Sequence, residues 1–200
     1  MKFNIAFDID NTITDGKSLY DFIAELHPTF DENKHYDVYP ITASLYNHGF
    51  LKEEINYLEF IHNNEKNIYL KDELFPGVLE FIAKLKEEGH NIFFITARSK
   101  DKEVFTKELF ERYNILYENV FHLESYDKTI ISEELNIDFF FEDNVNNATN
   151  LLNVKSIKKI FLVKAPYNIK ELNDNDNIIK FDDWNNIYER FNKEIKKHLK

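Results

Sequence analysis

The chain has 200 residues, 43% hydrophobic and 30% charged, which is enough for one domain with a full core or a core domain carrying a small insert. Its net charge of −11 argues against nucleic-acid polymers and anionic membranes as partners, and the absence of cysteine excludes disulfides and thiolate metal sites. No apolar run approaches the ~20 residues of a membrane span, and acidic residues come too early for a signal peptide, so we expect a cytoplasmic protein.

Short apolar runs that suit strands alternate with longer segments that suit helices. The predicted strands cover residues 3–9, 91–96, 120–123, 137–141, 159–163 and 178–181. The predicted core helices cover residues 78–88, 101–113, 129–135 and an amphipathic C-terminal segment from Trp184, and an Asn-Asp run at residues 173–177 predicts a polar turn. Strands that are apolar on both faces and alternate with helices indicate an α/β fold, with a Rossmann-like parallel sheet and helices on both of its faces.

The segment between the first strand and Pro76 is much longer than an ordinary connection between strands. It holds about 60 residues, whereas a crossover needs about 10–15. Helical patterns cover residues 18–26, with Ser18 as the predicted N-cap, and residues 51–69. We therefore expect a small helical cap inserted after the first strand. The expected division is a cap of residues 14–75 and a core of residues 1–13 and 76–200.

Two carboxylates, Asp8 and Asp10, leave the end of the first predicted strand together. In an open parallel sheet, ligands bind at the carboxyl ends of the strands. Like charges this close repel each other and attract a cation, and carboxylate oxygens suit Mg²⁺. The alternative interpretation is a solvated acidic turn in which Thr12 caps a helix.

Three further groups follow predicted apolar strands or begin predicted helices. Thr96 could hold phosphate oxygens with its hydroxyl and nearby backbone N–H groups, or it could cap the next helix, and Arg98 could steer an anion or lie on the surface. Lys128 begins a predicted helix, where the helix dipole disfavours a cation. Glu142 and Asp143 place acids at the same sheet edge as the first pair, or cap a helix.

Nucleophile, hydroxyl, cation and metal-binding acid thus occur in a consistent chain order. In this respect the sequence resembles the haloacid dehalogenase superfamily of phosphohydrolases, over residues 3–147 outside the insert. The four motifs of the family are matched by Asp8, Asp10 and Thr12, then by Thr96, then by Lys128, and last by Glu142 and Asp143. Lys100 and Lys102 compete for the third motif but are less well placed.

Within the superfamily, the sequence is similar to bacterial proteins grouped with the cytosolic type-C 5′(3′)-deoxyribonucleotidases. The similarity lies in residues 95–98, 141–144 and 165–168 and in Trp184. The fourth motif departs from the common pair of aspartates because Glu142 comes first. This departure leaves open which of the two acids meets the metal directly.

The resemblance implies a role for each matched residue. Asp8 attacks phosphorus and becomes an aspartyl-phosphate, and Asp10 protonates the leaving oxygen and then activates water. Thr96 and Lys128 are implied catalytic residues. The implied phosphate-binding residues are Thr12, Thr96, Ala97, Arg98 and Lys128. The implied Mg²⁺ ligands are Asp8, the backbone carbonyl of Asp10, and Asp143.

The expected substrate is a small phosphorylated molecule, most specifically a nucleoside or deoxynucleoside monophosphate. The alternatives are a phosphotransferase or mutase with the same intermediate, a phosphatase for another small metabolite, and a non-catalytic protein that binds a phosphate ligand. Asp10 favours hydrolysis, because it can activate water beside the nucleophile. The complete motif set argues against a protein that only binds.

Two further points concern aromatic residues and histidines. Aromatic side chains of the insert could stack on a base or pack its own core; they are Phe22, Tyr36, Tyr39 and Tyr46. The seven histidines show no metal-ligand spacing, so we expect surface or packing roles for them. The oligomeric state stays open.

Overall fold

The computed structural model describes residues 2–168 and 175–198, and its centre is a six-stranded sheet whose strands all run parallel. The strands are β1 (Asn4–Phe7), β2 (Asn91–Thr96), β3 (Val120–His122), β4 (Phe139–Glu142), β5 (Lys159–Val163) and β6 (Ile178–Phe181). Their order across the sheet is β3-β2-β1-β4-β5-β6. This confirms the predicted parallel α/β fold. Its switch point, where ligands bind in such sheets, lies between β1 and β4.

The strands around this switch point end within two residues of one another in register. Phe7 pairs with Phe94 of β2 on one side and with Phe141 of β4 on the other. The N–H of Asp8 then donates to the carbonyl of Phe141 at 3.0 Å. The residues just past β1, β2 and β4 therefore meet at one edge of the sheet.

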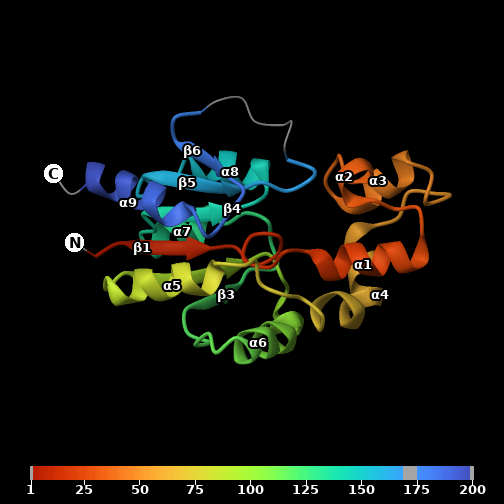
Figure 1. Ribbon diagram of the computed structural model, residues 1–200, viewed down its shortest axis with the longest axis horizontal. Coiled ribbons are helices and arrows are strands. Elements are labelled where there is room, and N and C mark those ends of the chain that lie inside the picture. Colours follow the sequence, from red (N-terminus) through yellow and green to blue (C-terminus); the bar gives the residue numbers. More distant parts are fainter. Residues whose placement is uncertain (1, 169–174, 199–200) are drawn as a thin grey trace.

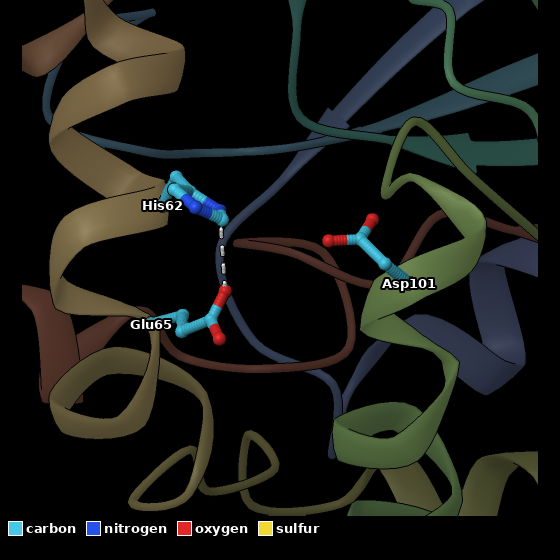
Figure 2. A group of neighbouring side chains, drawn as sticks. All are labelled: His62, Glu65 and Asp101. Carbon is cyan, nitrogen blue, oxygen red and sulfur yellow. Dashed lines mark ion pairs between the residues drawn. The ribbon is translucent and has the colours of Figure 1, made fainter.

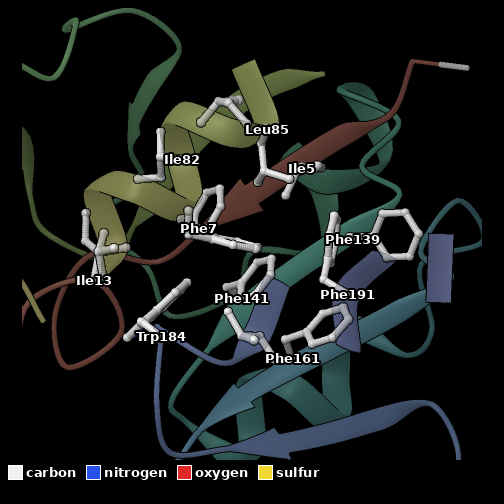
Figure 3. Close-up of a cluster of buried hydrophobic side chains, with 14 of the residues drawn as sticks. Ile5, Phe7, Ile13, Ile82, Leu85, Phe139, Phe141, Phe161, Trp184 and Phe191 are labelled. Carbon is white, nitrogen blue, oxygen red and sulfur yellow. The ribbon is translucent and has the colours of Figure 1, made fainter. Parts of the chain in front are cut away.

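Each face of the sheet has its own apolar core. On one face the rings of Phe7, Phe141 and Phe161 stack side by side, with centroids 4.7 and 4.8 Å apart (Figure 3). The helices on this face are α5 (Val78–Glu87), α6 (Glu103–Arg112) and α9 (Ile187–Lys197). The helices on the other face are α7 (Thr129–Glu134) and α8 (Val145–Leu151). Each aromatic pair adds about 0.5–1.5 kcal/mol beyond its buried area, so this stack fixes β1 against β4.

Four helices between β1 and α5 gather beyond the carboxyl ends of the strands (Figure 1). They are α1 (Lys17–Leu26), α2 (Glu32–His35), α3 (Ile41–Asn47) and α4 (Tyr57–Tyr69). Their shared apolar cluster extends to Phe105, Ala165 and Tyr167 of the sheet-bearing part. We call residues 14–75 the cap and the rest the core. The longest described helix, α4, has 13 residues, and none of the described helices is long and apolar enough to cross a membrane.

The start of α1 differs from the prediction. Its N-cap is Gly16, whose φ is +66°, and Ser18 lies inside the first turn with its hydroxyl donating to Asp72. A Cβ on residue 16 would lie 2.1 Å from Oδ1 of Asn11, so glycine is required at this left-handed position. The prediction that Ser18 caps the helix was therefore wrong, because its hydroxyl is used by a carboxylate far away in the sequence.

Helix α4 begins at Tyr57, later than the predicted residue 51. The side chain of Asn56 accepts the N–H of Glu59 at 3.2 Å, so an N-cap defines the start of the helix. The apolar spacing at residues 51–56 instead belongs to a connection that packs against the cap cluster.

Smaller differences concern three other segments. The helix predicted from residue 101 begins with a short 3-10 turn, η1 (Lys100–Lys102), and the C-terminal helix begins at Ile187, after Trp184 has packed into the core. Of the predicted turn at 173–177, residues 173 and 174 lie outside the described residues. In its second half, Oδ1 of Asn175 accepts the N–H of Asn177 at 2.8 Å, as in an Asx turn.

Candidate active site

The buried carboxylate of Asp8, directly past β1, lies against a buried lysine. The Nζ atom of Lys128 is 2.6 Å from Oδ1 of Asp8 and 2.7 Å from Oε2 of Glu142. The side chains of Lys128 and Glu142 are each 1% exposed, and that of Asp8 is 9% exposed. These contacts account for a lysine at the start of α7, where the helix dipole alone would disfavour it.

Asp143 is fixed by hydroxyl donors on both carboxylate oxygens. Thr12 donates to Oδ1 at 3.0 Å, and the hydroxyl of Tyr167 donates to Oδ2. The side-chain amide of Asn168 donates to the backbone carbonyl of Asp143 at 2.7 Å. The sequence pointed to residues 165–168 only through family likeness, so the positioning of Asp143 by Tyr167 and Asn168 is a role that sequence reasoning missed.

Negative charge exceeds positive charge around Asp8. Carboxylate oxygens of Asp8, Glu142 and Asp143 lie within 4.8 Å of one another, and all three residues are buried. Burial raises the pKa of Asp8 well above its usual value; Lys128 opposes this rise, and the two neighbouring acids add to it. Burial and the neighbouring charge of Glu142 raise the pKa of Asp143 to about 7, although the hydrogen bond from Tyr167 acts to lower it. Burial acts to lower the pKa of Lys128, but Asp8 and Glu142 outweigh it and raise that pKa.

This donor set fits a divalent cation. All the candidate ligand atoms are hard carboxylate oxygens, which suit Mg²⁺ or Ca²⁺ better than softer metals. Burial first, and then the neighbouring acids, raise the pKa values of Asp8 and Asp143, and Lys128 offsets only part of this rise. A bound cation would supply the missing positive charge.

Asp10 and Arg98 form a bidentate ion pair. Nε of Arg98 donates to Oδ2 of Asp10 at 2.9 Å, and NH2 donates to Oδ1 at 2.6 Å. NH2 also donates to Oδ2 of Asp72 at 2.9 Å, and the guanidinium lies 4.3 Å from the centroid of the Tyr69 ring. Arg98 was expected to bind phosphate, and its binding of substrate stays a prediction. In this structure its charge is directed to two carboxylates.

Three candidate groups had an alternative interpretation as helix caps: Thr12, Thr96 and the acid pair 142–143. The N-caps of the helices that follow them are instead Gly16, Ser99 and Asn144. The hydroxyl oxygen of Thr96, fully buried, accepts the N–H of Arg98 at 3.1 Å, and Ala97 between them lines the cavity described next. The cap interpretation is therefore wrong for all three.

A cavity of about 360 Å³ separates the sheet edge from the cap. The core residues of its lining include Asp8, Asp10, Ala97, Arg98, Lys128 and Asp143. Of the four aromatic residues considered from sequence, only Tyr39 lines it, whereas Phe22 and Tyr36 are buried in the cap cluster. Tyr57 and Tyr69 of α4 and Tyr126 of the core also line it, and sequence reasoning missed them. For Tyr57 and Tyr69, the only indication in the sequence was their position in the helix predicted for residues 51–69.

A second group of potential metal ligands joins the cap to the core. His62 and Glu65 of α4 point toward Asp101 of η1, and their ligand atoms lie within 4.8 Å of one another (Figure 2). Lys102 already contacts all three: its Nζ atom is 2.7 Å from Asp101 and 3.2 Å from Nδ1 of His62, and it also pairs with Glu65. Because a lysine balances these acids, we interpret the group as an ion-pair contact between cap and core.

The sequence profile of haloacid dehalogenase-like hydrolases matches residues 4–155, and the chain belongs to this family. This confirms the resemblance drawn from the motifs, and with it an enzyme of the hydrolase class. A nucleotidase of Clostridium acetobutylicum is 33% identical to the chain over 188 residues, which cover 94% of this chain and 92% of that protein.

Solved structures of the family share the fold at low sequence identity. A hydrolase of family IA, variant 3, from Entamoeba histolytica has a TM-score of 0.66 at 13% identity, over 98% of this chain and 100% of that one. A family hydrolase from Deinococcus radiodurans, with bound phosphate and sodium, has a TM-score of 0.62 at 10% identity, over 98% and 96%. At these identities the likeness concerns the fold alone.

Proposed function

We propose that the protein is a Mg²⁺-dependent phosphomonoester hydrolase that forms an aspartyl-phosphate on Asp8, and that its substrates are nucleoside or deoxynucleoside monophosphates. The observation that carries the proposal is the position of Asp8. It is a buried carboxylate on the cavity wall, beside a buried lysine and two further acids. Such a group combines a nucleophile with the positive charge that an incoming phosphate requires.

Asp8 is suited to attack because its two oxygens differ in environment. Oδ1 is held by Lys128 at 2.6 Å, which fixes the orientation of the carboxylate. Among the described residues, no hydrogen bond reaches Oδ2, so this oxygen is the one we assign to attack on phosphorus. Lys128 would also offset charge on the transferring phosphoryl group, and the buried hydroxyl of Thr96 lies at the same sheet edge.

Asp10 is the proposed acid and base. Its side chain is 37% exposed and lines the cavity, two residues from the nucleophile. We assign it to protonate the leaving oxygen and then to take a proton from the water that hydrolyses the aspartyl-phosphate. This second role favours a hydrolase over a phosphotransferase or mutase, and over a protein that only binds phosphate.

The proposed residues for Mg²⁺ are Asp8, the backbone carbonyl of Asp10, and Asp143. Glu142 is the fourth oxygen donor nearby, and we assign it to support Lys128, with which it pairs at 2.7 Å. When bound, the ion would supply positive charge that draws the phosphate toward an otherwise acidic site. Thr12 and Tyr167 hold Asp143 in place for this purpose.

The nucleotide assignment rests on the cavity and on the similar nucleotidase of C. acetobutylicum. The cavity has a volume of about 360 Å³, within the usual range of about 300–1,000 Å³ for small-molecule sites. Tyr39, Tyr57, Tyr69 and Tyr126 line it. Stacking of a base on an aromatic ring is worth roughly 1–3 kcal/mol, or about 5- to 150-fold in affinity, which a sugar phosphate cannot gain.

Phosphate release from dUMP, dTMP, a hexose phosphate and p-nitrophenyl phosphate tests the proposal. We expect turnover with Mg²⁺, none in excess chelator, and higher kcat/KM for the nucleotides. Asp8→Asn should abolish turnover and keep the fold, because the amide is nearly isosteric but is a poor nucleophile. Full activity of Asp8→Asn or in chelator would contradict the mechanism, and a preference for the hexose phosphate would contradict only the nucleotide assignment.

A further inference from the structure

Two linkers connect the cap to the core, and they run side by side. Thr14 of the first linker and Leu74 of the second form an antiparallel bridge. The N–H of Asp15 donates to the carbonyl of Glu73 at 3.0 Å. Asp72 lies immediately before this paired segment, so the second linker places a carboxylate at the junction of cap and core.

Asp72 is held through both its carboxylate and its backbone. The hydroxyl of Ser18, in the first turn of α1, donates to its Oδ1. Arg112 of α6 donates to the backbone carbonyls of Asp72 at 2.7 Å and of Leu70 at 2.9 Å. The side chain of Asp72 is 4% exposed. It is therefore a fixed, buried carboxylate tied both to the cap and to the core.

Arg98 pairs its single positive charge with two carboxylates that differ in their exposure. Its NH2 atom donates to Asp10 at 2.6 Å and to Asp72 at 2.9 Å, and its side chain is 1% exposed. Its NH1 atom donates to the hydroxyl of Thr106 at 3.3 Å. Asp10, by contrast, is 37% exposed and faces the cavity. Of these two carboxylates, Asp72 is buried at the junction of cap and core, whereas Asp10 is partly exposed to the cavity.

On the function proposed above, Asp10 must turn an oxygen from Arg98 toward the leaving oxygen of the substrate. With Asp10 as its only partner, this movement would leave a buried guanidinium without a counter-charge, which is strongly unfavourable. We propose that Asp72 is a positioning residue that keeps Arg98 paired and in place while Asp10 moves onto the leaving oxygen. Asp72 itself contacts neither the substrate nor the reacting atoms.

Asp72→Asn tests this role because it keeps the shape of the side chain and its acceptor for Ser18 but removes the charge. Asp10 then becomes the only carboxylate paired with Arg98 among the described residues and is held away from the leaving oxygen. The affected step is attack by Asp8 with proton transfer to the leaving oxygen. The ratio kcat/KM reports this step and excludes later hydrolysis of the aspartyl-phosphate.

The expected signature is a loss that depends on the leaving group. For a nucleoside monophosphate, Asp72→Asn should lower kcat/KM roughly tenfold or more, a part of the roughly 10²–10⁴-fold that general acid–base catalysis provides. For p-nitrophenyl phosphate, whose leaving group departs as a stable anion, the loss should stay below about threefold, since little of that acid catalysis is needed. Burial raises the pKa of Asp72 to about 7, although Arg98 acts to lower it. Assays near pH 8 therefore keep Asp72 ionised in the parent protein.

The matched control is Glu73→Gln, an identical change of charge at the exposed neighbouring residue, which should leave both substrates unaffected. A second variant, Ser18→Ala, removes a hydrogen bond to Asp72 without changing any charge, and it should give a smaller loss with the same selectivity. An equal loss on both substrates, or no loss on the nucleotide, in either variant would overturn the role of Asp72. Circular dichroism checks that each variant is folded. If Asp72→Asn does not fold, the result for Ser18→Ala alone tests the role of Asp72.

Asp10→Asn separates this inference from the function on which it rests. If Asp10→Asn retains nucleotide hydrolysis, the proposed role of Asp10 is wrong. If Asp10→Asn is inactive while Asp72→Asn affects both substrates equally, only the role of Asp72 is wrong.

Discussion

Replacing Lys128 by Met should destabilise the protein in a pH-dependent way. The substitution keeps the apolar stem but removes the ammonium group that lies 2.6 Å from Asp8 and 2.7 Å from Glu142. Removing one partner of a buried ion pair destabilises by about 3–5 kcal/mol, because the remaining charge is left uncompensated. For a chain of this size, each kcal/mol corresponds to about 2–4 °C, so the melting temperature should fall by about 6–20 °C.

The pH dependence has a definite sign. Burial raises the pKa of Asp8 and Lys128 opposes that rise, so the variant should raise the pKa of Asp8 further. A carboxyl group whose pKa is raised by folding favours the folded state below its unfolded pKa, and this contribution is lost as pH rises through the folded pKa. The destabilisation by Lys128→Met should therefore be larger near pH 8 than near pH 6, because a lower pH favours the protonated form of Asp8, which carries no uncompensated charge.

Urea or thermal unfolding in the presence of chelator measures both effects. The matched control is Lys164→Met, because Lys164 pairs with Asp182 at a similar distance, 2.8 Å, but the two side chains are 45% and 69% exposed. Such a surface pair contributes about 0–1 kcal/mol. A loss for Lys128→Met no larger than that of the control, or one that is equal at both pH values, would refute the assignment of Lys128 as the buried counter-ion of the site.

Two further predictions concern the metal and the base. Mg²⁺ should raise the melting temperature more near pH 8 than near pH 6, because protons compete with the ion for Asp143 and Asp8. Burial raises the pKa of Asp143 to about 7, so this competition falls between the two pH values. An equal rise in melting temperature at both pH values would argue against these ligands. Tyr126→Ala, at a residue that is 42% exposed and lines the cavity, should lower kcat/KM for nucleoside monophosphates by about 5- to 150-fold and leave a hexose phosphate unaffected. An equal loss on both substrates would count against stacking at Tyr126.

The sheet was predictable from sequence because its strands are apolar on both faces. Phe139, Phe140 and Phe141 are all fully buried, so the run stands out against the amphipathic helices around it. The parallel arrangement then followed from the alternation of such runs with helices, and in a parallel sheet the motifs that follow the strands meet at one edge. The position of Lys128 was also signalled, because a cation at a helix start needs a partner.

Contacts between cap and core could not be predicted. Asp72 lies in a polar linker and resembles a solvated acid in the sequence, yet its partners Ser18 and Arg98 come from distant segments. The pairing of Arg98 with Asp10 also depends on how the loop after β2 lies across the end of β1. Local patterns carry no information about such distances, so the sequence indicated which residues carry the chemistry but not which residues hold them in place.

Trapping the covalent intermediate tests the central claim most directly. Rapid acid quenching during turnover of a nucleoside monophosphate with Mg²⁺, followed by peptide mass spectrometry, should find a phosphoryl group on Asp8. The label should disappear in Asp8→Asn and should decay in the parent protein when the substrate is exhausted. Turnover with no label on Asp8 under conditions that preserve acyl phosphates, or a label on another residue, would contradict the proposed mechanism.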